Sequence, residues 1–158
     1  MTVRVLSPVA GSVVALSAVP DPVFAQAMVG PGVAVEPAPE SRDVVAPIDG
    51  VVVTLHSHAF VVAGKSGQAV LVHLGIDTVK MKGEFFTPHV VKGESVRSGQ
   101  LIIGWDPGVV TAAGYSAMCP VIALDTQGSL LTELAPDGPV AAGDPLFLWH
   151  SPSAGDSR

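Results

Sequence analysis

The sequence predicts an all-β protein with an internal duplication and at most one or two short helices. Short clusters of Val, Ile and Leu are separated by turn residues, since 17 glycines and 14 prolines are spread over 158 residues. Such clusters are typical of many short strands. Two sequence patterns also occur twice each, which indicates two halves of similar fold. We expect one domain over residues 1–150 and a disordered polar tail at 151–158.

The first repeated pattern is P-x-x-G followed by a β-branched run, which begins at Pro8 and again at Pro47. The second is V-x-x-G-x-x-apolar, which begins at Val96 and again at Val140. In each copy a turn precedes an extended segment, because Pro and Gly favour turns whereas β-branched residues favour strands. The duplication is therefore predicted from residues at matching positions.

Strands are expected wherever apolar residues cluster between turn signals. In chain order these are 3–6, the second half of 7–16, 32–36, 46–58, 60–63, 68–74, 87–91, 100–106, 119–125, 129–134 and 145–150. Two segments favour helix instead. Residues 19–30 contain two prolines that prevent a strand and leave room for one helical turn. Residues 107–117 begin with Pro and are rich in Ala, although Gly108 and Gly114 weaken that helix.

Composition narrows the class of function. The net charge of −6 and the pI near 5.1 argue against non-specific nucleic-acid binding and favour a partner with a basic surface. No apolar run approaches the roughly 20 residues that span a bilayer. The chain begins without a basic region followed by an apolar segment, and its single cysteine, Cys119, forms no internal disulfide. These features predict a cytoplasmic protein.

The segment 68–82, QAVLVHLGIDTVKMK, carries a histidine at the end of a strand-forming run. Alternate residues of a strand share a face, so His73 points the same way as Leu71, while Val72 and Leu74 point the other way. Two apolar faces predict a central strand. On this stretch alone His73 could be a core histidine bonded to a backbone carbonyl or a functional group.

Two further histidines, His56 and His58, are expected to project from one face of a strand. If that strand lies beside the strand of His73, three imidazoles meet near the carboxylate of Asp77, because Gly75 can bend the chain between His73 and Asp77. Such a cluster suits phosphoryl transfer through histidine, with a neutral imidazole as nucleophile and a second donor beside it. It equally suits a zinc site for hydrolysis. Spacing leaves both mechanisms open.

At these residues the sequence resembles the glucose-class IIA component of the phosphoenolpyruvate-dependent sugar phosphotransferase system. Residues 67–79, GQAVLVHLGIDTV, meet every fixed position of that family's signature. The resemblance extends through VPDPVFAQAMVGPGVAVEP (19–37), APIDGVVV (46–53), HAF (58–60) and KGE (82–84). It implies a cytoplasmic antiparallel β-sandwich or barrel, in agreement with the repeats. It also implies a phosphocarrier, a phosphotransferase component that carries the phosphoryl group covalently and needs no obligatory cofactor.

The resemblance assigns a role to each matching residue. His73 would accept a phosphoryl group through Nε2 from the histidine-containing phosphocarrier protein HPr and pass it to a cysteine of a IIB domain. His58 would hydrogen-bond the phosphoryl group. Val23, Phe24, Met28, Leu71 and Val79 match an apolar rim for docking, and Asp21 and Asp77 match acidic positions beside it. Both acids could instead have local roles, a turn at Asp21 and a cap at Asp77. Relatives also bind regulatory proteins, sometimes with zinc between His58 and His73.

The sequence departs from the family pattern at two positions. His56 stands where the family usually has Thr, and it could donate the same hydrogen bond, bind metal or face solvent. Phe85 replaces a Gly, so the backbone of the turn after the His73 strand could change. His89 and His150 are assigned to packing and to the end of the last strand.

Two other classes of function are compatible with parts of the sequence. A zinc hydrolase could use His56, His58, His73 and Asp77, which resemble pieces of lysostaphin-type endopeptidases in reverse chain order. A lipoyl- or biotinyl-type carrier needs an exposed lysine at a hairpin tip, and Lys65 in the turn 64–67 is the candidate. The sequence does not indicate which sugar, glucose, N-acetylglucosamine or another, a phosphocarrier of this kind would serve.

Overall fold

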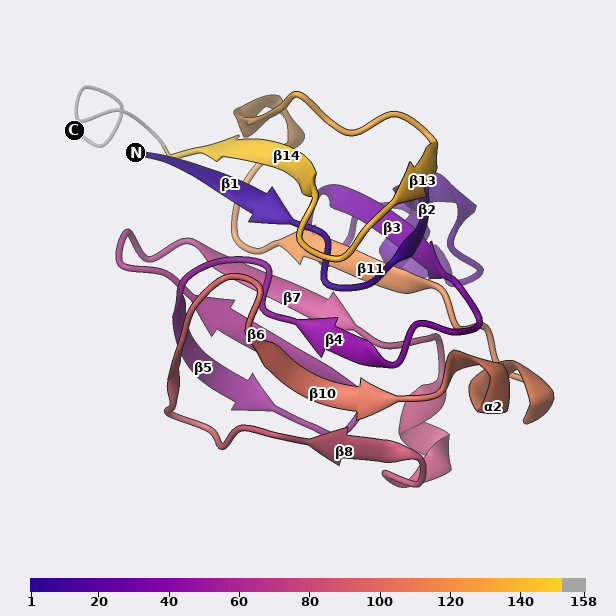
Figure 1. The fold of residues 1–158 in the computed structure, drawn as a ribbon. Coiled ribbons are helices and arrows are strands. Elements are labelled where there is room, and N and C mark those ends of the chain that lie inside the picture. The colour runs from indigo at the N-terminus through magenta and orange to yellow at the C-terminus, as the bar shows by residue number, and fades with distance from the viewer. Residues whose placement is uncertain (152–158) are drawn as a thin grey trace.

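A computed structural model describes residues 1–151, and it consists of three antiparallel sheets with two short α-helices (Figure 1). The largest sheet has eight strands in the order β13-β2-β3-β11-β7-β6-β5-β9, and the two others have the orders β1-β14-β12 and β4-β10-β8. The strands are β1 (Thr2–Leu6), β2 (Gly11–Ala15), β3 (Gly32–Pro37), β4 (Asp43–Val45), β5 (Gly50–Leu55), β6 (Ala59–Ala63), β7 (Ala69–His73), β8 (Phe86–Pro88), β9 (Ser95–Val96), β10 (Leu101–Trp105), β11 (Cys119–Ala123), β12 (Leu131–Thr132), β13 (Gly138–Val140) and β14 (Pro145–His150). The predicted all-β antiparallel fold is confirmed.

The strand order shows the predicted duplication. The eight-stranded sheet reads as two halves that meet between β11 and β7, so that β13, β2 and β3 in one half have the same relations as β9, β5 and β6 in the other. The two small sheets repeat this relation, with β1, β14 and β12 corresponding to β4, β10 and β8. A pseudo-twofold axis therefore passes between the two central strands.

Individual residues obey the same symmetry. Gly11 pairs with Val140 in one half, and Gly50 pairs with Val96 in the other, so both repeated sequence patterns meet at equivalent points of the sheet. The bond from Leu6 N to Pro47 O is equivalent to the bond from Val45 N to Pro8 O, and both are 2.9 Å long. In the same way, the bond from Ser7 N to Asp144 O (2.7 Å) is equivalent to the bond from Ala46 N to Gln100 O (2.9 Å). Residues 6–11 thus correspond to 45–50, and 96–100 to 140–144.

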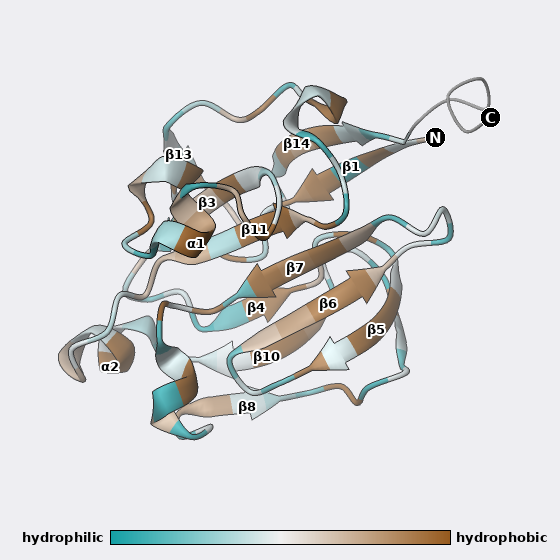
Figure 2. Ribbon diagram, turned by 180° about the vertical axis from the view of Figure 1, so that it is seen from behind, coloured by the Kyte–Doolittle hydropathy of each residue, from teal (hydrophilic) through white to brown (hydrophobic). Residues whose placement is uncertain are grey.

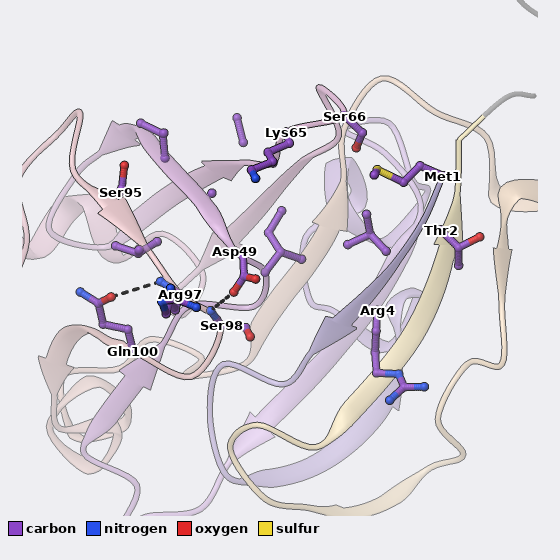
Figure 3. A pocket seen from close by; sticks show the side chains of 17 residues that line it. Met1, Thr2, Arg4, Asp49, Lys65, Ser66, Ser95, Arg97, Ser98 and Gln100 are labelled. Atoms are coloured by element: carbon purple, nitrogen blue, oxygen red, sulfur yellow. Dashed lines mark hydrogen bonds between the residues drawn. The ribbon is translucent and has the colours of Figure 1, made fainter. Parts of the chain in front are cut away.

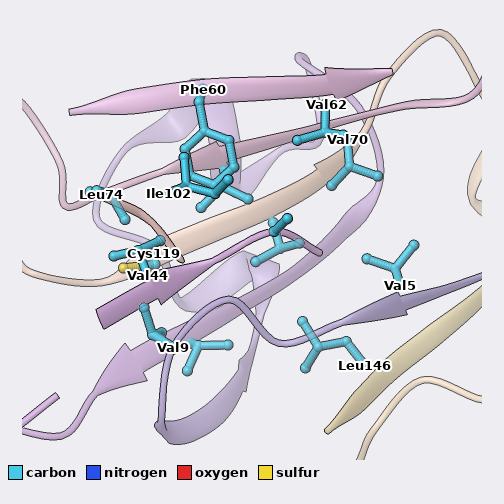
Figure 4. Close-up of a cluster of buried hydrophobic side chains, with 14 of the residues drawn as sticks. Val5, Val9, Val44, Phe60, Val62, Val70, Leu74, Ile102, Cys119 and Leu146 are labelled. Atoms are coloured by element: carbon cyan, nitrogen blue, oxygen red, sulfur yellow. The ribbon is translucent and has the colours of Figure 1, made fainter. Parts of the chain in front are cut away.

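The main core lies between the sheets and is filled by small and branched side chains (Figure 4). Val5, Phe60, Ile102 and Leu146 are all completely buried there, although they come from four different strands. A second, smaller cluster contains Phe24 and Ile76. Figure 2 shows the apolar character of β6 and β7, two neighbouring strands of the large sheet that are joined by a hairpin.

Two side chains begin the helices. Asp21 accepts a hydrogen bond from the backbone of Val23 and caps α1 (Pro22–Ala25), and Asp106 does the same for α2 (Pro107–Ala112). The helical turn expected within 19–30 is confirmed. The helix expected over 107–117 is shorter, because the chain turns at Gly114, where φ is +94°. Three 3-10 turns, Leu16–Ala18, Thr78–Met81 and Gly128–Leu130, complete the short elements. In the described part of the chain, no helix is both long and apolar enough to cross a membrane.

Several sequence expectations need correction. His56 and His58 lie in the turn between β5 and β6, not within a strand, because pairing of β5 ends at Leu55. Strand β4 was not expected, since it has only three residues, and the strand predicted at 129–134 shortens to β12 after a 3-10 turn. Of the predicted tail, Ser151 donates its backbone N–H to the carbonyl oxygen of Met1, and residues 152–158 lie outside the described range.

Candidate functional site

The site forms where β7 ends beside the turn between β5 and β6. β7 lies between β6 and β11 in the large sheet, which confirms the prediction of a central strand. His73 is the last residue of β7 and pairs with Ala59, and the next backbone N–H, from Leu74, donates to the carbonyl oxygen of His58 at 2.7 Å. Burial alternates along β7, with Val72 fully buried and His73 half-buried. The sheet register therefore brings His58 to His73.

His73 is fixed by a hydrogen bond between its Nδ1 atom and the carbonyl oxygen of Gly75, at 2.6 Å. A carbonyl oxygen only accepts, so Nδ1 carries the proton and Nε2 keeps its lone pair. The turn depends on Gly75, which has φ of +80°, and a Cβ there would lie 2.7 Å from the carbonyl oxygen of Ser116. The ring of Phe24 packs against His73 with centroids 5.2 Å apart.

The three imidazoles predicted from the sequence do meet. The ring of His58 lies edge-on to that of His73, with centroids 5.2 Å apart and an interplanar angle of 73°. The ring of His56 stacks on that of His58, with centroids 5.7 Å apart and an interplanar angle of 23°. His56 is exposed, whereas His58 and His73 are half-buried. The turn, and not a shared strand face, brings His56 and His58 together.

Burial keeps the two inner imidazoles neutral. Desolvation, followed by the neighbouring His73 and His56, lowers the pKa of His58 from 6.5 to about 4. Desolvation also lowers the pKa of His73, while the bond to Gly75 and the carboxylates of Asp21 and Asp77 oppose that shift. A neutral His73 has the free lone pair that a nucleophile needs.

The two acidic residues near His73 differ in their local bonding. Asp21 uses its carboxylate to cap α1, accepting from Val23 N at 2.8 Å, so the expected turn role is present. Asp77 precedes the 3-10 turn at Thr78–Met81 with φ of +61°, but its side chain makes no capping hydrogen bond. Its carboxylate is exposed and remains available to a partner. Both carboxylates also act electrostatically on His73, so neither role excludes the other.

The apolar residues predicted to form the docking rim differ widely in exposure. Val23, Met28 and Val79 are 44%, 69% and 59% exposed, respectively. Leu71 is half-buried, and Phe24 is buried beside His73, so Phe24 offers little surface to a partner. Sequence reasoning assigned no role to Thr78, although it is a fixed position of the signature. Thr78 is fully buried, and its hydroxyl donates to the carbonyl oxygen of Leu74 at 2.6 Å, which braces the turn after His73.

The turn after the 3-10 segment keeps a glycine-like backbone despite its phenylalanine. Phe85 has φ of +70°, in the left-handed region, and its side chain is 56% exposed. Nearby Gly83 packs against the hydroxyl of Ser57, between the two histidines of the β5–β6 turn. Phe85 therefore keeps the left-handed backbone expected of a glycine and adds an exposed aromatic side chain to the turn.

The remaining candidate groups are placed as follows. Among residues 1–151, no set of three or more His, Cys, Asp or Glu side chains is arranged to hold a metal ion. Lys65 lies exposed at the tip of the β6–β7 hairpin. His150 ends β14 as expected, with its ring nitrogens bonded to Thr2 and Thr132. The prediction that His89 packs on a strand face is wrong, because His89 is exposed just beyond β8, next to Gly104.

The comparisons with known proteins agree with this geometry. Residues 3–128 match the family described as phosphoenolpyruvate-dependent sugar phosphotransferase system, EIIA 1. A glucose-specific EIIA component of Oceanobacillus iheyensis is 39% identical over 79% of this chain and 76% of its own length. A glucose-specific EIIA component of Haemophilus influenzae is 34% identical over 92% and 87% of the two chains. The solved glucose permease IIA of Mycoplasma capricolum has a TM-score of 0.86 and 33% identity, covering 94% of this chain and 96% of its own.

Some relatives are much longer. The beta-glucoside-specific EIIBCA component of Dickeya chrysanthemi is 39% identical over 89% of this chain, but the chain spans only 22% of that protein. Fold and matches together define a phosphotransferase component of the EIIA type, a class that carries its phosphoryl group on a histidine. The chain belongs to the EIIA 1 family of the phosphoenolpyruvate-dependent sugar phosphotransferase system.

Proposed function

We propose that this protein is a cytoplasmic phosphocarrier that accepts a phosphoryl group on Nε2 of His73 from phosphorylated HPr and passes it to a cysteine of a IIB domain. The observation that carries the proposal is the 2.6 Å hydrogen bond between Nδ1 of His73 and the carbonyl oxygen of Gly75, which leaves Nε2 unprotonated. The sugar is of the glucose or N-acetylglucosamine class, in keeping with the glucose-specific relatives.

The proposed transfer is a pair of substitutions at phosphorus. In the first, the Nε2 lone pair of His73 bonds to phosphorus while the donor's P–N bond breaks, and its electron pair stays on the donor nitrogen. In the second, a cysteine thiolate of the IIB domain attacks phosphorus and the pair returns to Nε2. The Nδ1–H to Gly75 bond holds the ring in one tautomer throughout, and no metal is required because the imidazole is the nucleophile.

His58 stabilises the phosphoryl group in this proposal. Its edge faces the ring of His73 at a centroid distance of 5.2 Å, and its lowered pKa leaves it with one N–H to donate. His56 stacks on His58 and supplies a further donor where relatives usually have Thr. Neither ring becomes the stable carrier, since only His73 has its Nδ1 bonded to a backbone carbonyl at the site.

Both protein partners would dock on the apolar rim, which consists of Val23, Met28, Leu71 and Val79. Phe24 is buried and packs against the ring of His73. Removing water from around the phosphohistidine limits hydrolysis while a partner is bound. Asp21 and Asp77 lie beside the rim and would attract a basic partner surface. Regulatory proteins could use the same face, and zinc shared with such a partner would bind between His58 and His73.

A phosphorylation assay tests this function. Purified protein is incubated with phosphoenolpyruvate, the first enzyme of the system and HPr, and the mass and stability of the product are measured. We expect one acid-labile, base-stable phosphate per chain and none on His73→Ala. Equal labelling of His73→Ala and the unsubstituted protein would refute the site. His89→Gln serves as control, because His89 is exposed away from the three imidazoles.

A further inference from the structure

A cavity of about 790 Å³ is lined in part by the β6–β7 hairpin (Figure 3). This hairpin precedes β7, whereas His73 is at the other end of that strand. Its walls come from β1, from the turn between β4 and β5, from the β6–β7 hairpin tip and from the turn after β9. Because β7 runs from this hairpin to the histidines, the cavity is distinct from the phosphoryl-transfer site. The size is within the range of about 300–1,000 Å³ that is typical of small-molecule sites.

The cavity concentrates positive charge in an acidic protein. Arg4, Lys65 and Arg97 line it, three of the chain's eight basic residues, together with Asp49 as its single carboxylate, one of fourteen in the chain. Within residues 1–151, the ion pair that forms is Arg42 with Asp106, so none of the three cations lining the cavity is neutralised by a partner. An anion bound here would meet an attractive field in a molecule whose net charge repels anions elsewhere.

The internal duplication provides a comparison within the same molecule. The pseudo-twofold axis relates five of the lining residues, Lys65 not among them, to residues in the other half, where the backbone hydrogen bonds are equivalent. The pairs are Arg4 with Asp43, Asp49 with Ala10, Ser95 with Pro139, Arg97 with Ala141, and Ser98 with Ala142. None of these five counterparts is a cation or carries a hydroxyl group, so the backbone does not demand Arg4, Arg97 or the two serines at these places. These four polar residues are therefore features of one half only.

The mixture of groups indicates the kind of anion. Arginine binds phosphate oxygens through two parallel N–H groups, and lysine adds a point charge. One oxygen of Asp49 accepts from Ser98 N at 2.7 Å, which leaves its other oxygen, with the hydroxyls of Ser95 and Ser98, to bond hydroxyl groups of a ligand. We propose that this cavity binds a phosphate ester that carries neighbouring hydroxyl groups, a sugar phosphate or the phosphoglycerol headgroup of a lipid. The proposal is independent of the function proposed for His73.

Two-dimensional NMR of the full chain tests this site, with glucose 6-phosphate, glucose and phosphatidylglycerol vesicles as separate probes. We expect glucose 6-phosphate to shift the amides of residues 63–66 and 95–100, whereas uncharged glucose does not. Lys65→Gln and Arg97→Gln should each weaken binding about tenfold, the effect of one lost charge-assisted hydrogen bond. Lys92→Gln removes the same charge outside the cavity and should change the affinity less than twofold.

The two sources of the phosphate ester give different results. Binding of glucose 6-phosphate assigns a soluble ligand, and binding of vesicles alone, lost in Arg97→Gln, assigns the lipid headgroup. The proposal is overturned if neither probe binds at millimolar concentration, or if the shifted amides surround His58 and His73 instead. It is also overturned if Lys92→Gln weakens binding as much as Arg97→Gln does, because the attraction would then belong to the whole surface.

Discussion

The Nδ1 atom of His73 lies 2.6 Å from the carbonyl oxygen of Gly75, and this contact decides which ring nitrogen is available for chemistry. The contact depends on a left-handed backbone at Gly75 and on the buried hydroxyl of Thr78, which holds the carbonyl group of Leu74 in the same turn. The turn after β7 therefore fixes the orientation of the His73 ring.

His58 should matter more for passing the phosphoryl group on than for receiving it. His58→Gln loses the imidazole that contacts the ring of His73 with centroids 5.2 Å apart, while Nε2 of His73 stays free. We expect labelling by phosphorylated HPr to persist and transfer to the IIB domain to slow about a hundredfold, as for loss of one stabilising donor. Rapid-quench measurement of both steps checks this. An unchanged rate of transfer would remove His58 from the mechanism.

The stability of the fold should depend on pH because burial lowers the pKa of two imidazoles. The pKa of His58 is about 4 in the folded protein and 6.5 when unfolded, so the unfolded chain binds more protons between these values. The contribution of His58 to the free energy of unfolding is therefore fully present above about pH 6.5, and it decreases as the pH falls towards 4. The lowered pKa of His73 acts in the same direction.

Urea unfolding at several pH values measures this dependence. His58→Gln should flatten the decrease between pH 6.5 and 4, whereas His89→Gln should not. The effect is smaller than the full shift implies, because solvent reaches His58 and screens its charge. Parallel curves for the unsubstituted protein and His58→Gln would mean that His58 titrates normally.

Gly75, in the turn after β7, can be compared with Gly67, in the β6–β7 hairpin, to separate the effect of backbone conformation from that of steric clash. Gly75 and Gly67 have φ of +80° and +83°, but a Cβ on Gly75 would lie 2.7 Å from the carbonyl oxygen of Ser116, and one on Gly67 meets nothing within 4 Å. We expect Gly67→Ala to cost about 1 kcal/mol of stability and Gly75→Ala at least about 2 kcal/mol more. Gly75→Ala should also lose phosphorylation. Equal costs in denaturant unfolding would contradict the clash.

The rim can be tested with two equally conservative substitutions. Val79 is 59% exposed in the 3-10 turn after β7, and Val91 is 67% exposed in the turn after β8. Val79→Ser should raise the KM for HPr about five- to tenfold with little change in kcat, since it removes apolar area from a docking surface. Val91→Ser should leave both unchanged. A similar KM in the two variants would exclude Val79 from the rim.

The sequence predicted much of this arrangement because strand alternation and turn residues are local signals. The alternate burial of residues 69–73 and the matched glycines Gly11 and Gly50 followed directly from such patterns. The strand assignment of His56 and His58 was wrong, because two histidines separated by one residue fit a strand face and a turn equally well.

What could not be predicted depends on contacts between distant segments. The burial of Phe24 against His73 and the T-shaped pair of His58 and His73 require the tertiary structure. The basic cavity is a further example, since Arg4, Lys65 and Arg97 are far apart in the sequence and share no motif. The residue-by-residue correspondence between 6–11 and 45–50 also required the backbone hydrogen bonds, which only the structure shows.

The most direct measurement is NMR of the imidazole nitrogens in ¹⁵N-labelled protein phosphorylated through HPr. We expect phosphorus coupling at Nε2 of His73 and a proton retained on its Nδ1, as the bond to Gly75 requires. Phosphorus coupling at Nδ1 of His73, or at any nitrogen of His58 or His56, would contradict the proposed site.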